Sequence, residues 1–327
     1  MSSRLEREFR DQSRGEQSLR AVFMGTPSFA VPVLDALYEC REVEVAAVYT
    51  PPDRKRGRGQ TLEACPVKAR GEELGIPVVQ PGTFRNAEAV SELESYRPDA
   101  IVVAAYGRLL PADVLAIPRY GCLNLHPSLL PKHRGPAPVA GAILAGDAVT
   151  GVSVMLLDEG MDTGPIVAQR ERRVEDSNDA ATLTETLFAD GAALLIETLP
   201  GWAEGSVSAE AQDDERATYT SKLERADGMA DWGLSAEILA RRQRAYTPWP
   251  GLYTTWEGSE LKLLEVAAVS GVNAEPGRVS STSDYEIAVG TGDGLLAVRR
   301  LQLAGRRPSS GGDFLRGYPE FPGSMLV

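Results

Sequence analysis

Histidine and cysteine are scarce in this chain, and long apolar runs are missing. Its 327 residues include 2 histidines and 3 cysteines. The cysteines lack the spacing of metal ligands, so neither a metal site nor a disulfide framework is expected. No apolar run reaches the roughly 18 residues needed to span a bilayer. We therefore expect a cytoplasmic protein with reduced thiols, no metal and no membrane association.

Charge is distributed unevenly along the chain. Residues 1–19 are rich in Arg, Glu and Ser, which is typical of a disordered extension and not of a secretory signal. The net charge is -12, yet residues 221–327 hold 12 Lys and Arg against 13 Asp and Glu. The acidity thus lies in the front part, and a local basic patch can still bind an anionic partner such as RNA.

Short apolar runs alternate with helical patterns through the first two hundred residues. The run from Asp99 to Tyr106 is nearly all apolar, as expected of a strand that is covered on both faces. Further strands are predicted at residues 21–24, 43–49, 78–79, 122–126 and 152–158. This alternation predicts a Rossmann-like, mostly parallel α/β sheet in a domain spanning residues 20–203. Ligands of such sheets bind beyond the carboxyl ends of the strands.

The pattern changes after a helix that is predicted from Asp179 to Thr198 and ends before Pro200. Residues 204–222 are polar and predict a linker. The remaining residues, 223–327, contain one helical segment and several β-like runs separated by Gly and Pro. The helix is predicted at residues 235–245 and the strands at 252–256, 261–266, 285–289 and 295–303. This spacing predicts a small C-terminal β-barrel, similar to an OB fold.

The two histidines narrow the search for a catalytic centre. His126 ends a predicted strand two residues after Asn124, and side chains at this spacing share one face of a strand. The later turn at residues 158–164 presents carboxylates beside glycines. A carboxylate that accepts from one imidazole nitrogen favours the charged ring. The other nitrogen and the Asn124 amide can then donate to an oxyanion, which is what acyl transfer to an amine requires.

Each of these elements has an ordinary explanation when taken alone. A lone histidine is usually structural, and an Asn-x-His triplet occurs by chance. Asp158, Glu159 and Asp162 can form an ordinary acidic turn. Residues 25–27 follow a first strand as in dinucleotide folds, but they lack the Gly-x-Gly-x-x-Gly spacing. A tight turn is therefore favoured over NAD binding.

Several short sequence motifs are distributed along the chain, and they are most informative in combination. They occupy residues 23–30 (FMGTPSFA), 52–53 (PD), 57–59 (GRG), 66–68 (PVK), 124–126 (NLH), 128–131 (SLLP), 134–138 (RGPAP), 151–155 (GVSVM), 161–164 (MDTG), 231–232 (DW) and 246–250 (YTPWP). From about Leu19 to the C-terminus the chain resembles the methionyl-tRNA formyltransferases. The NLH, SLLP and DTG elements are specific for folate-dependent formyltransferases, and the GRG loop and the late motifs select the tRNA branch.

The resemblance implies a catalytic triad and a formyl donor. The triad falls on Asn124, His126 and Asp162, with Asp162 preferred over the neighbouring carboxylates. Asn124 and a protonated His126 would hold the oxyanion, while Asp162 keeps the ring charged. The implied donor is 10-formyltetrahydrofolate. The pocket for folate would be bordered by the loop Ser128, Leu129, Leu130 and Pro131, with main-chain groups beyond Asp158 at the pterin.

The resemblance also implies methionyl initiator tRNA as the acceptor, and no obligate protein partner is inferred. Residues 54–60 are basic and contain glycines, so they can reach phosphates. The resemblance favours Arg58 as a tRNA contact, ahead of Arg56 and Lys55, whereas a solvated surface loop is the alternative. A second candidate surface consists of arginines at 241, 242, 244, 299, 300, 306 and 307, for which pairing with local carboxylates is the alternative.

Two other functions remain open at this point. A sister formyltransferase acting on a sugar amine or a glycinamide nucleotide would use the same triad, but would not need the basic loop or the C-terminal barrel. A non-catalytic nucleotide-binding or nucleic-acid-binding protein would not need the triad. A folate-dependent formylation assay separates the three.

Overall fold

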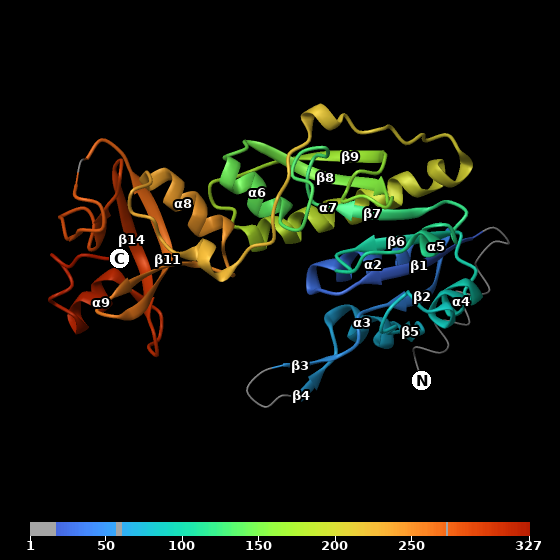
Figure 1. Cartoon of the computed structure of the whole chain (residues 1–327), viewed down its shortest axis with the longest axis horizontal. Helices are drawn as coiled ribbons and strands as arrows, with labels where there is room; N and C mark the ends of the chain where they lie inside the picture. The colour runs from blue at the N-terminus through green and yellow to red at the C-terminus, as the bar shows by residue number, and fades with distance from the viewer. Residues whose placement is uncertain (1–17, 57–60, 273) are drawn as a thin grey trace. The chain divides into compact units, whose positions relative to one another are not determined.

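The computed structural model describes residues 18–56, 61–272 and 274–327 (Figure 1). Nearly all of the predicted N-terminal extension lies outside these ranges. The chain divides into two compact units, each of which is discontinuous in sequence. The first unit comprises Met1–Gly135, Thr150–Arg172 and Thr184–Tyr219, and the second comprises Pro136–Val149, Arg173–Leu183 and Thr220–Val327.

A seven-stranded sheet forms the centre of the first unit, in the order β5-β2-β1-β6-β7-β8-β9. The strands are β1 (Leu19–Gly25), β2 (Val43–Tyr49), β5 (Val78–Val79), β6 (Ala100–Ala104), β7 (Cys122–His126), β8 (Val149–Leu156) and β9 (Ile166–Arg173). The first five strands of this order pair in parallel, and β8 is antiparallel to β7. The predicted mostly parallel α/β sheet is confirmed.

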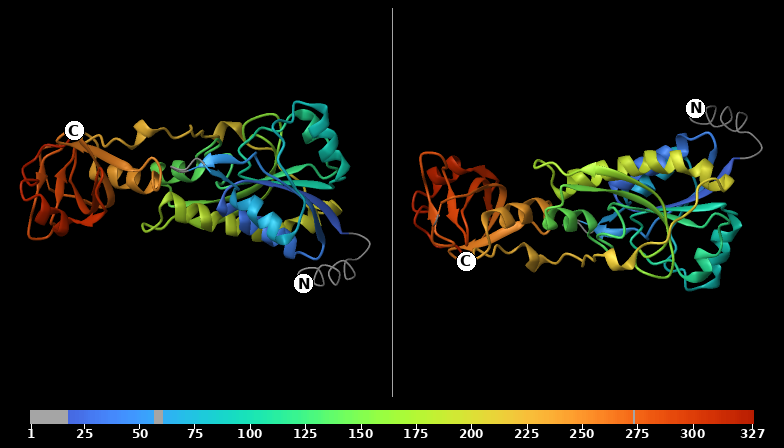
Figure 2. Two further views of the ribbon diagram at one scale, coloured as in Figure 1. Left: turned by 90° about the horizontal axis from the view of Figure 1, so that it is seen from below. Right: turned by 90° about the horizontal axis from the view of Figure 1, so that it is seen from above.

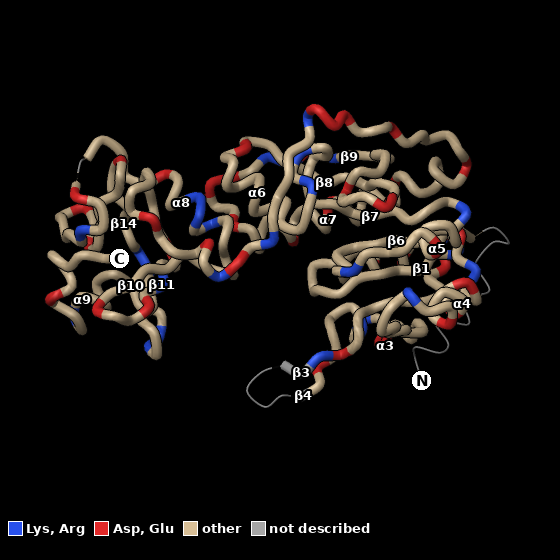
Figure 3. Tube along the Cα trace, viewed as in Figure 1, with Lys and Arg blue, Asp and Glu red and all other residues tan. Residues whose placement is uncertain are grey.

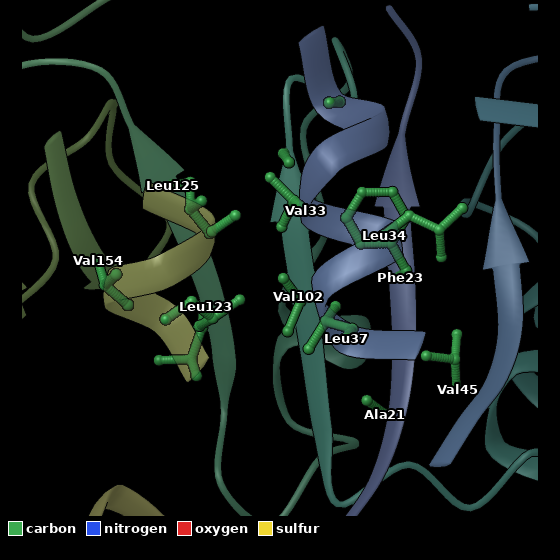
Figure 4. Packing of buried hydrophobic residues seen from close by; sticks show 14 of the residues in the cluster. Ala21, Phe23, Val33, Leu34, Leu37, Val45, Val102, Leu123, Leu125 and Val154 are labelled. Carbon is green, nitrogen blue, oxygen red and sulfur yellow. The ribbon is translucent and has the colours of Figure 1, made fainter. Parts of the chain in front are cut away.

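Helices cover both faces of this sheet, as the views in Figure 2 show. One face carries α2 (Val31–Glu39), α3 (Pro66–Leu74) and α7 (Ala180–Glu204), whereas the other carries α4 (Ala87–Ser95) and α5 (Ala112–Leu115). Alternate residues of β1 serve the two cores: Phe23 packs on the first face and Met24 on the second. Figure 4 shows Phe23 and Val102 beside Leu34 and Leu37 of α2. Burial on both faces explains why the central strands read as continuous apolar runs.

Helix α7 is longer than its sequence suggests. It was predicted to end before Pro200, and this is wrong because the helix continues to Glu204 with Pro200 inside it. Proline removes one helical hydrogen bond, which disfavours this position. Trp202 compensates beyond the proline, since its indole N–H donates to the carbonyl of Tyr120 at 2.9 Å and its ring packs against the core.

The second unit contains an antiparallel sheet in the order β10-β11-β14-β13-β12, with β15 paired to β14. Its strands are β10 (Leu252–Trp256), β11 (Ser259–Val269), β12 (Val279–Ser280), β13 (Ala288–Gly290), β14 (Leu295–Leu303) and β15 (Ser309–Ser310). Its helices are α6 (Pro138–Ala145), α8 (Ala236–Ala245) and α9 (Gly311–Gly317), and it contains a short 3-10 turn at Arg225–Gly228. The first unit contains two such turns among its described residues, at Ser28–Ala30 and Asp214–Arg216. Trp256 packs against the rings of Phe314, Tyr318 and Phe321 at its core. The prediction of a small C-terminal β-domain is confirmed, and its sheet is antiparallel.

The last four residues link the two outer strands of this sheet. On one side, Val327 and Thr255 of β10 exchange two main-chain hydrogen bonds, at 2.9 and 3.2 Å. On the other side, Leu326 N–H donates to the carbonyl of Gly277 and Val279 N–H donates to Ser324, both at 2.9 Å. The side chain of Leu326 is buried between them. The main-chain hydrogen bonds of the C-terminal tail therefore bridge the two outer strands and complete the barrel.

Candidate active site

Strand β7 carries two polar side chains on one face. Leu123 and Leu125 point into the core beneath α2 and α7. Because side chains alternate along a strand, Asn124 and His126 face the opposite side. His126 is the last residue of β7 and is 5% exposed. The strand thus presents both groups at its carboxyl end, where parallel sheets bind their ligands.

The ring of His126 lies between two oxygen atoms. Its Nε2 is 3.0 Å from the main-chain carbonyl of His133, and its Nδ1 is 3.7 Å from Oδ2 of Asp162. A carbonyl can only accept a hydrogen bond, so Nε2 carries the proton. In the neutral ring, Nδ1 therefore keeps a lone pair on the side of Asp162. This geometry prepares Nδ1 to accept a proton.

Burial decides the charge of this ring. It lowers the pKa of His126 below its ordinary value, while the nearby Asp162 carboxylate and the hydrogen bond to His133 raise it to a smaller extent. Burial therefore favours the neutral ring in the unliganded protein. The prediction that Asp162 keeps His126 charged during the reaction stays a prediction. In the unliganded protein, the desolvation of the buried ring lowers the pKa of His126 more than the Asp162 carboxylate raises it.

Asp162 sits in a tight turn between β8 and β9. Its φ angle of 56° places it in the left-handed region, which Asp tolerates better than most residues. One carboxylate oxygen accepts a hydrogen bond from the main-chain N–H of Gly135 at 2.8 Å. The carboxylate of Asp158 is engaged within the turn, where it accepts hydrogen bonds from Gly160 N–H and from the Thr163 hydroxyl. The structure thus directs Asp162, and not Asp158, towards His126.

The Asn124 amide is available for a substrate. It is partly exposed, and its side chain has no hydrogen-bond partner among the residues that the structure describes. Neighbouring strands hold its main chain on both sides, through Val103 of β6 and Met155 of β8. A fixed backbone with an uncommitted amide is what a preorganised oxyanion donor requires.

The loop after β7 is held by its own side chains. Ser128 is fully buried, and its hydroxyl donates to the carbonyl of Lys132 at 2.6 Å. Ser153 bridges the loop by donating to the Ser128 carbonyl and accepting from Leu130 N–H. Leu129 packs against Gly151, where a Cβ atom would lie 2.5 Å from its methyl carbon. Of the four loop residues predicted to border folate, only Leu129 and Pro131 are partly exposed.

Comparisons with known proteins place this geometry in a family. Residues 19–199 match the formyl transferase family, and residues 222–319 match the formyl transferase C-terminal domain. The methionyl-tRNA formyltransferase of Roseiflexus sp. (strain RS-1) is 48% identical over 94% of this chain and 95% of its own length. That of Magnetococcus marinus is 42% identical over 94% and 98%. The chain belongs to the methionyl-tRNA formyltransferase family.

Solved structures share the fold of this formyltransferase at lower identity. The N-formyltransferase from Helicobacter canadensis, in complex with folinic acid and dTDP-3-aminofucose, has a TM-score of 0.63 and 17% identity, covering 86% of this chain and 99% of its own. HypX from Aquifex aeolicus, in complex with tetrahydrofolic acid, has a TM-score of 0.61 and 20% identity over 91% of this chain. The formyltransferase spans about half of HypX, at 47%. At these identities the likeness concerns the fold alone.

Two short antiparallel strands, which we call the hairpin, lie on either side of positions 57–60 of the predicted basic loop. Strand β3 (Arg54–Arg56), which contains Lys55 and Arg56, pairs antiparallel with β4 (Thr61–Glu63). The predicted tRNA contact Arg58 lies outside the described residues. The base of the hairpin is fixed by Lys68, which donates to Asp53 at 2.6 Å and to Gln80 at 2.8 Å. This hairpin was not foreseen as secondary structure, because its short strands carry charged residues.

The arginines of the second unit differ in their partners. Basic and acidic residues are interspersed along its trace (Figure 3). Arg241 and Arg300 lie near Glu237 and Glu265, and Arg244 donates to the carbonyl of Asn178. By contrast, three exposed arginines form no ion pair with any described residue, namely Arg299, Arg306 and Arg307. The alternative of pairing with carboxylates thus holds for only part of this predicted surface.

A polar segment far along the chain packs beside the predicted site, and the sequence did not indicate it. The polar segment at residues 210–219, which we call the strap, runs beside the loop that follows β7. Glu210 exchanges two main-chain hydrogen bonds with Ile166 at 2.8 Å, and Arg134 N–H donates to the carbonyl of Thr218 at 2.8 Å. Gln212 contacts the Asp162 turn. No feature of this polar stretch in the sequence indicates that it packs here.

Neither a membrane-spanning helix nor a cluster of metal ligands is found in the described part of the formyltransferase. No helix in the described part of the chain is both long enough and apolar enough to cross a membrane. Within the same residues, no three His, Cys, Asp or Glu side chains come together as metal ligands would.

Proposed function

We propose that this chain transfers the formyl group of 10-formyltetrahydrofolate to the α-amine of methionyl initiator tRNA in the cytoplasm. One observation carries this proposal: the His126 ring is held between His133 and Asp162 at the carboxyl end of β7. The identity of 48% to a methionyl-tRNA formyltransferase over 94% of the chain supports the choice of acceptor.

The first step forms the new carbon–nitrogen bond. The neutral α-amine of the methionyl group attacks the formyl carbon, and the formyl oxygen takes up the negative charge. The Asn124 amide donates to this oxyanion, because it is uncommitted in the protein and fixed on β7. Charge that develops only in the transition state is where such a donor lowers the barrier.

The second step moves one proton and breaks the old bond. The attacking nitrogen becomes positively charged, and Nδ1 of His126 accepts its proton. The imidazolium then has an acceptor on each side, His133 at Nε2 and Asp162 at Nδ1. The same proton passes to the folate N10 as the carbon–N10 bond breaks. The products are formylmethionyl-tRNA and tetrahydrofolate, and atoms and charges balance without a protein nucleophile.

Folate binding is proposed for the loop at residues 128–131 and the turn that begins at Asp158. The buried Ser128 hydroxyl and the Asp158 carboxylate stabilise these two segments from within. Leu129 and Pro131 are partly exposed and supply apolar surface. Main-chain groups of the turn supply the polar contacts. This arrangement suits a flat heteroaromatic ring with several donors and acceptors.

Acceptor binding is proposed for two basic regions. Lys55 and Arg56 lie on β3 of the first unit, and Arg58 is proposed beside them from the sequence alone. The second unit carries the exposed arginines at 299, 306 and 307. Both suit a phosphate backbone more than a small amine. No obligate protein partner is needed for the two steps above.

Formylation assays with three different acceptors test the proposal. In each assay the purified chain is given 10-formyltetrahydrofolate and one acceptor, which is methionyl initiator tRNA, an amino-sugar nucleotide or glycinamide ribonucleotide. The release of tetrahydrofolate is followed. We expect a kcat/KM for the charged tRNA at least 1000-fold above that for either small amine. A small amine that matches the charged tRNA would shift the assignment to the sister enzymes. If none of the three amines is formylated, the chain is a binding protein and not a formyltransferase.

A further inference from the structure

The two residues that contact the His126 ring from either side, Asp162 and His133, have an unfavourable backbone conformation. Asp162 has a φ angle of 56° and His133 one of 58°. Non-glycine residues pay a conformational cost in this region and persist there only when their surroundings fix them. The elements that fix them therefore control the distance between the Asp162 carboxylate and the His126 ring.

Gln212 of the strap is one such element. Its amide nitrogen donates to the carbonyls of Asp162 and Gly164, at 2.8 and 2.7 Å. Its amide oxygen accepts from Nε and Nη2 of Arg134, at 3.0 and 2.9 Å. Carbonyls only accept and a guanidinium only donates, so this orientation alone satisfies all four contacts. Both ends of the side-chain amide are fully used.

Arg134 connects this amide to the loop that touches the triad. It is 1% exposed, and it also donates to Asp214 at 2.7 Å and to the Tyr219 hydroxyl at 3.1 Å. The residue before it, His133, accepts from the His126 ring, and the residue after it, Gly135, donates to the Asp162 carboxylate. Gln212 thus ties the loop that holds His126 to the turn that carries Asp162.

We propose that Gln212 is a positioning residue for the formyl transfer, because its amide fixes the Asp162 turn against Arg134. This inference rests on the proposed function of the triad. Gln212 contacts the main chain of Asp162, and Gly135 contacts its carboxylate, so the two together set where the carboxylate points. Displacements of about 1 Å in such a site reduce the rate strongly.

The substitution Gln212→Glu separates the two ends of the amide. The new carboxylate still accepts from Arg134, but its other oxygen faces the carbonyls of Asp162 and Gly164 and repels them. We expect kcat for formylation to fall about 10- to 100-fold, with the KM for 10-formyltetrahydrofolate changed by less than about threefold. Asp214→Asn is the matched control. It also alters a carboxylate partner of Arg134, but its side chain is 81% exposed and forms no hydrogen bond with the Asp162 turn among the residues that the structure describes, so we expect wild-type kcat.

Gln212→Met supplies a second measurement that does not depend on added charge. It keeps the length of the side chain and removes the tie. Asp162 then supports the protonated His126 less well, so we expect the acid limb of the kcat/KM profile to move to lower pH. A loss confined to melting temperature, with wild-type kcat and pH profile in the folded fraction, would show a merely structural role and overturn the inference.

The wild-type protein shows whether the proposed function or only the positioning role of Gln212 has failed. If wild type fails to formylate methionyl-tRNA, the proposed function itself fails. If wild type formylates and both Gln212 variants do so with the same kcat and the same pH profile, the proposed function stands and the positioning role is refuted. A lowered kcat in both variants, with Asp214→Asn unchanged, supports the role.

Discussion

The carboxylate of Asp162 lies 3.7 Å from Nδ1 of His126, on the side of the ring that carries no proton in the neutral state. This separation exceeds hydrogen-bond distance, so the carboxylate acts through its charge when the ring becomes protonated. In the proposed mechanism, Asp162 therefore contributes mainly after the amine has given up its proton, and not before substrate binds.

Removing the charge of Asp162 should slow the chemical step. In Asp162→Asn the side chain keeps an acceptor for Gly135 N–H but no longer stabilises the imidazolium, and we expect kcat to fall about 100-fold or more. Glu159→Gln is the matched control, since it removes the same charge from an exposed position on the same turn. Single-turnover formylation measures both. Equal rates for the two variants would contradict the role of Asp162.

Truncating Asn124 should affect catalysis without affecting the fold. Its amide has no side-chain partner within the described part of the chain, so Asn124→Ala leaves no buried group unpaired. We expect the melting temperature to stay close to wild type while kcat falls about 100- to 1000-fold, the typical loss of one oxyanion donor. Asn124→Asp should be slower still, because it places a negative charge against the oxyanion. A kcat within tenfold of wild type in Asn124→Ala would rule out the assignment.

The sequence allowed the main sheet and the shared face of Asn124 and His126 on one strand to be predicted, because these signals are local. Strands β2, β7, β10 and β14 have the bounds that their apolar runs predict. Asn124 and His126 share a face because the period of a strand is 2. Strand β9 was missed, since it carries IVAQRERR and is mostly exposed at the edge of the sheet. An edge strand lacks the second buried face that makes a strand visible in sequence.

The features that escaped prediction depend on contacts between distant residues. Gln212 and Asp162 are 50 positions apart, and the strap that joins them reads as an ordinary polar linker. The same holds for the C-terminal tail that completes the barrel. The lowered pKa of His126 was not predicted either, because the burial that lowers it follows from the packed structure and not from the motif.

Burial of His126 predicts a specific pH dependence. Asp162 and His133 face the ring, and burial still lowers its pKa below the unfolded value of about 6.5. The unfolded chain therefore binds the proton first. The stabilising contribution is complete above about pH 6.5 and is lost as pH falls through the folded pKa, at up to about 1.4 kcal/mol per pH unit. Unfolding free energies of wild type and His126→Asn should converge at low pH and diverge above it. The kcat/KM of wild type should fall along the same acid limb, because the base must be neutral.

The C-terminal tail should determine the stability of the second unit. Leu326 is 4% exposed between β10 and β12, so Leu326→Ala should lower the free energy of unfolding by about 2–5 kcal/mol. Its neighbour Met325 is 41% exposed, and Met325→Ala should change it by about 0.5 kcal/mol or less. Denaturant unfolding of both variants tests this. Similar values for the two would show that the tail does not complete the barrel core.

Exposed arginines without carboxylate partners should contact the tRNA backbone. Each phosphate contact that is lost flattens the slope of log K against log salt concentration by about 0.7–0.9. We therefore expect the double variant Arg306→Gln with Arg307→Gln to bind initiator tRNA more weakly and with a shallower salt dependence. Arg278→Gln is the control, because Arg278 is engaged with Glu275 at 2.9 Å. If the control flattens the slope as much as the double variant does, net charge and not a defined contact surface attracts the tRNA.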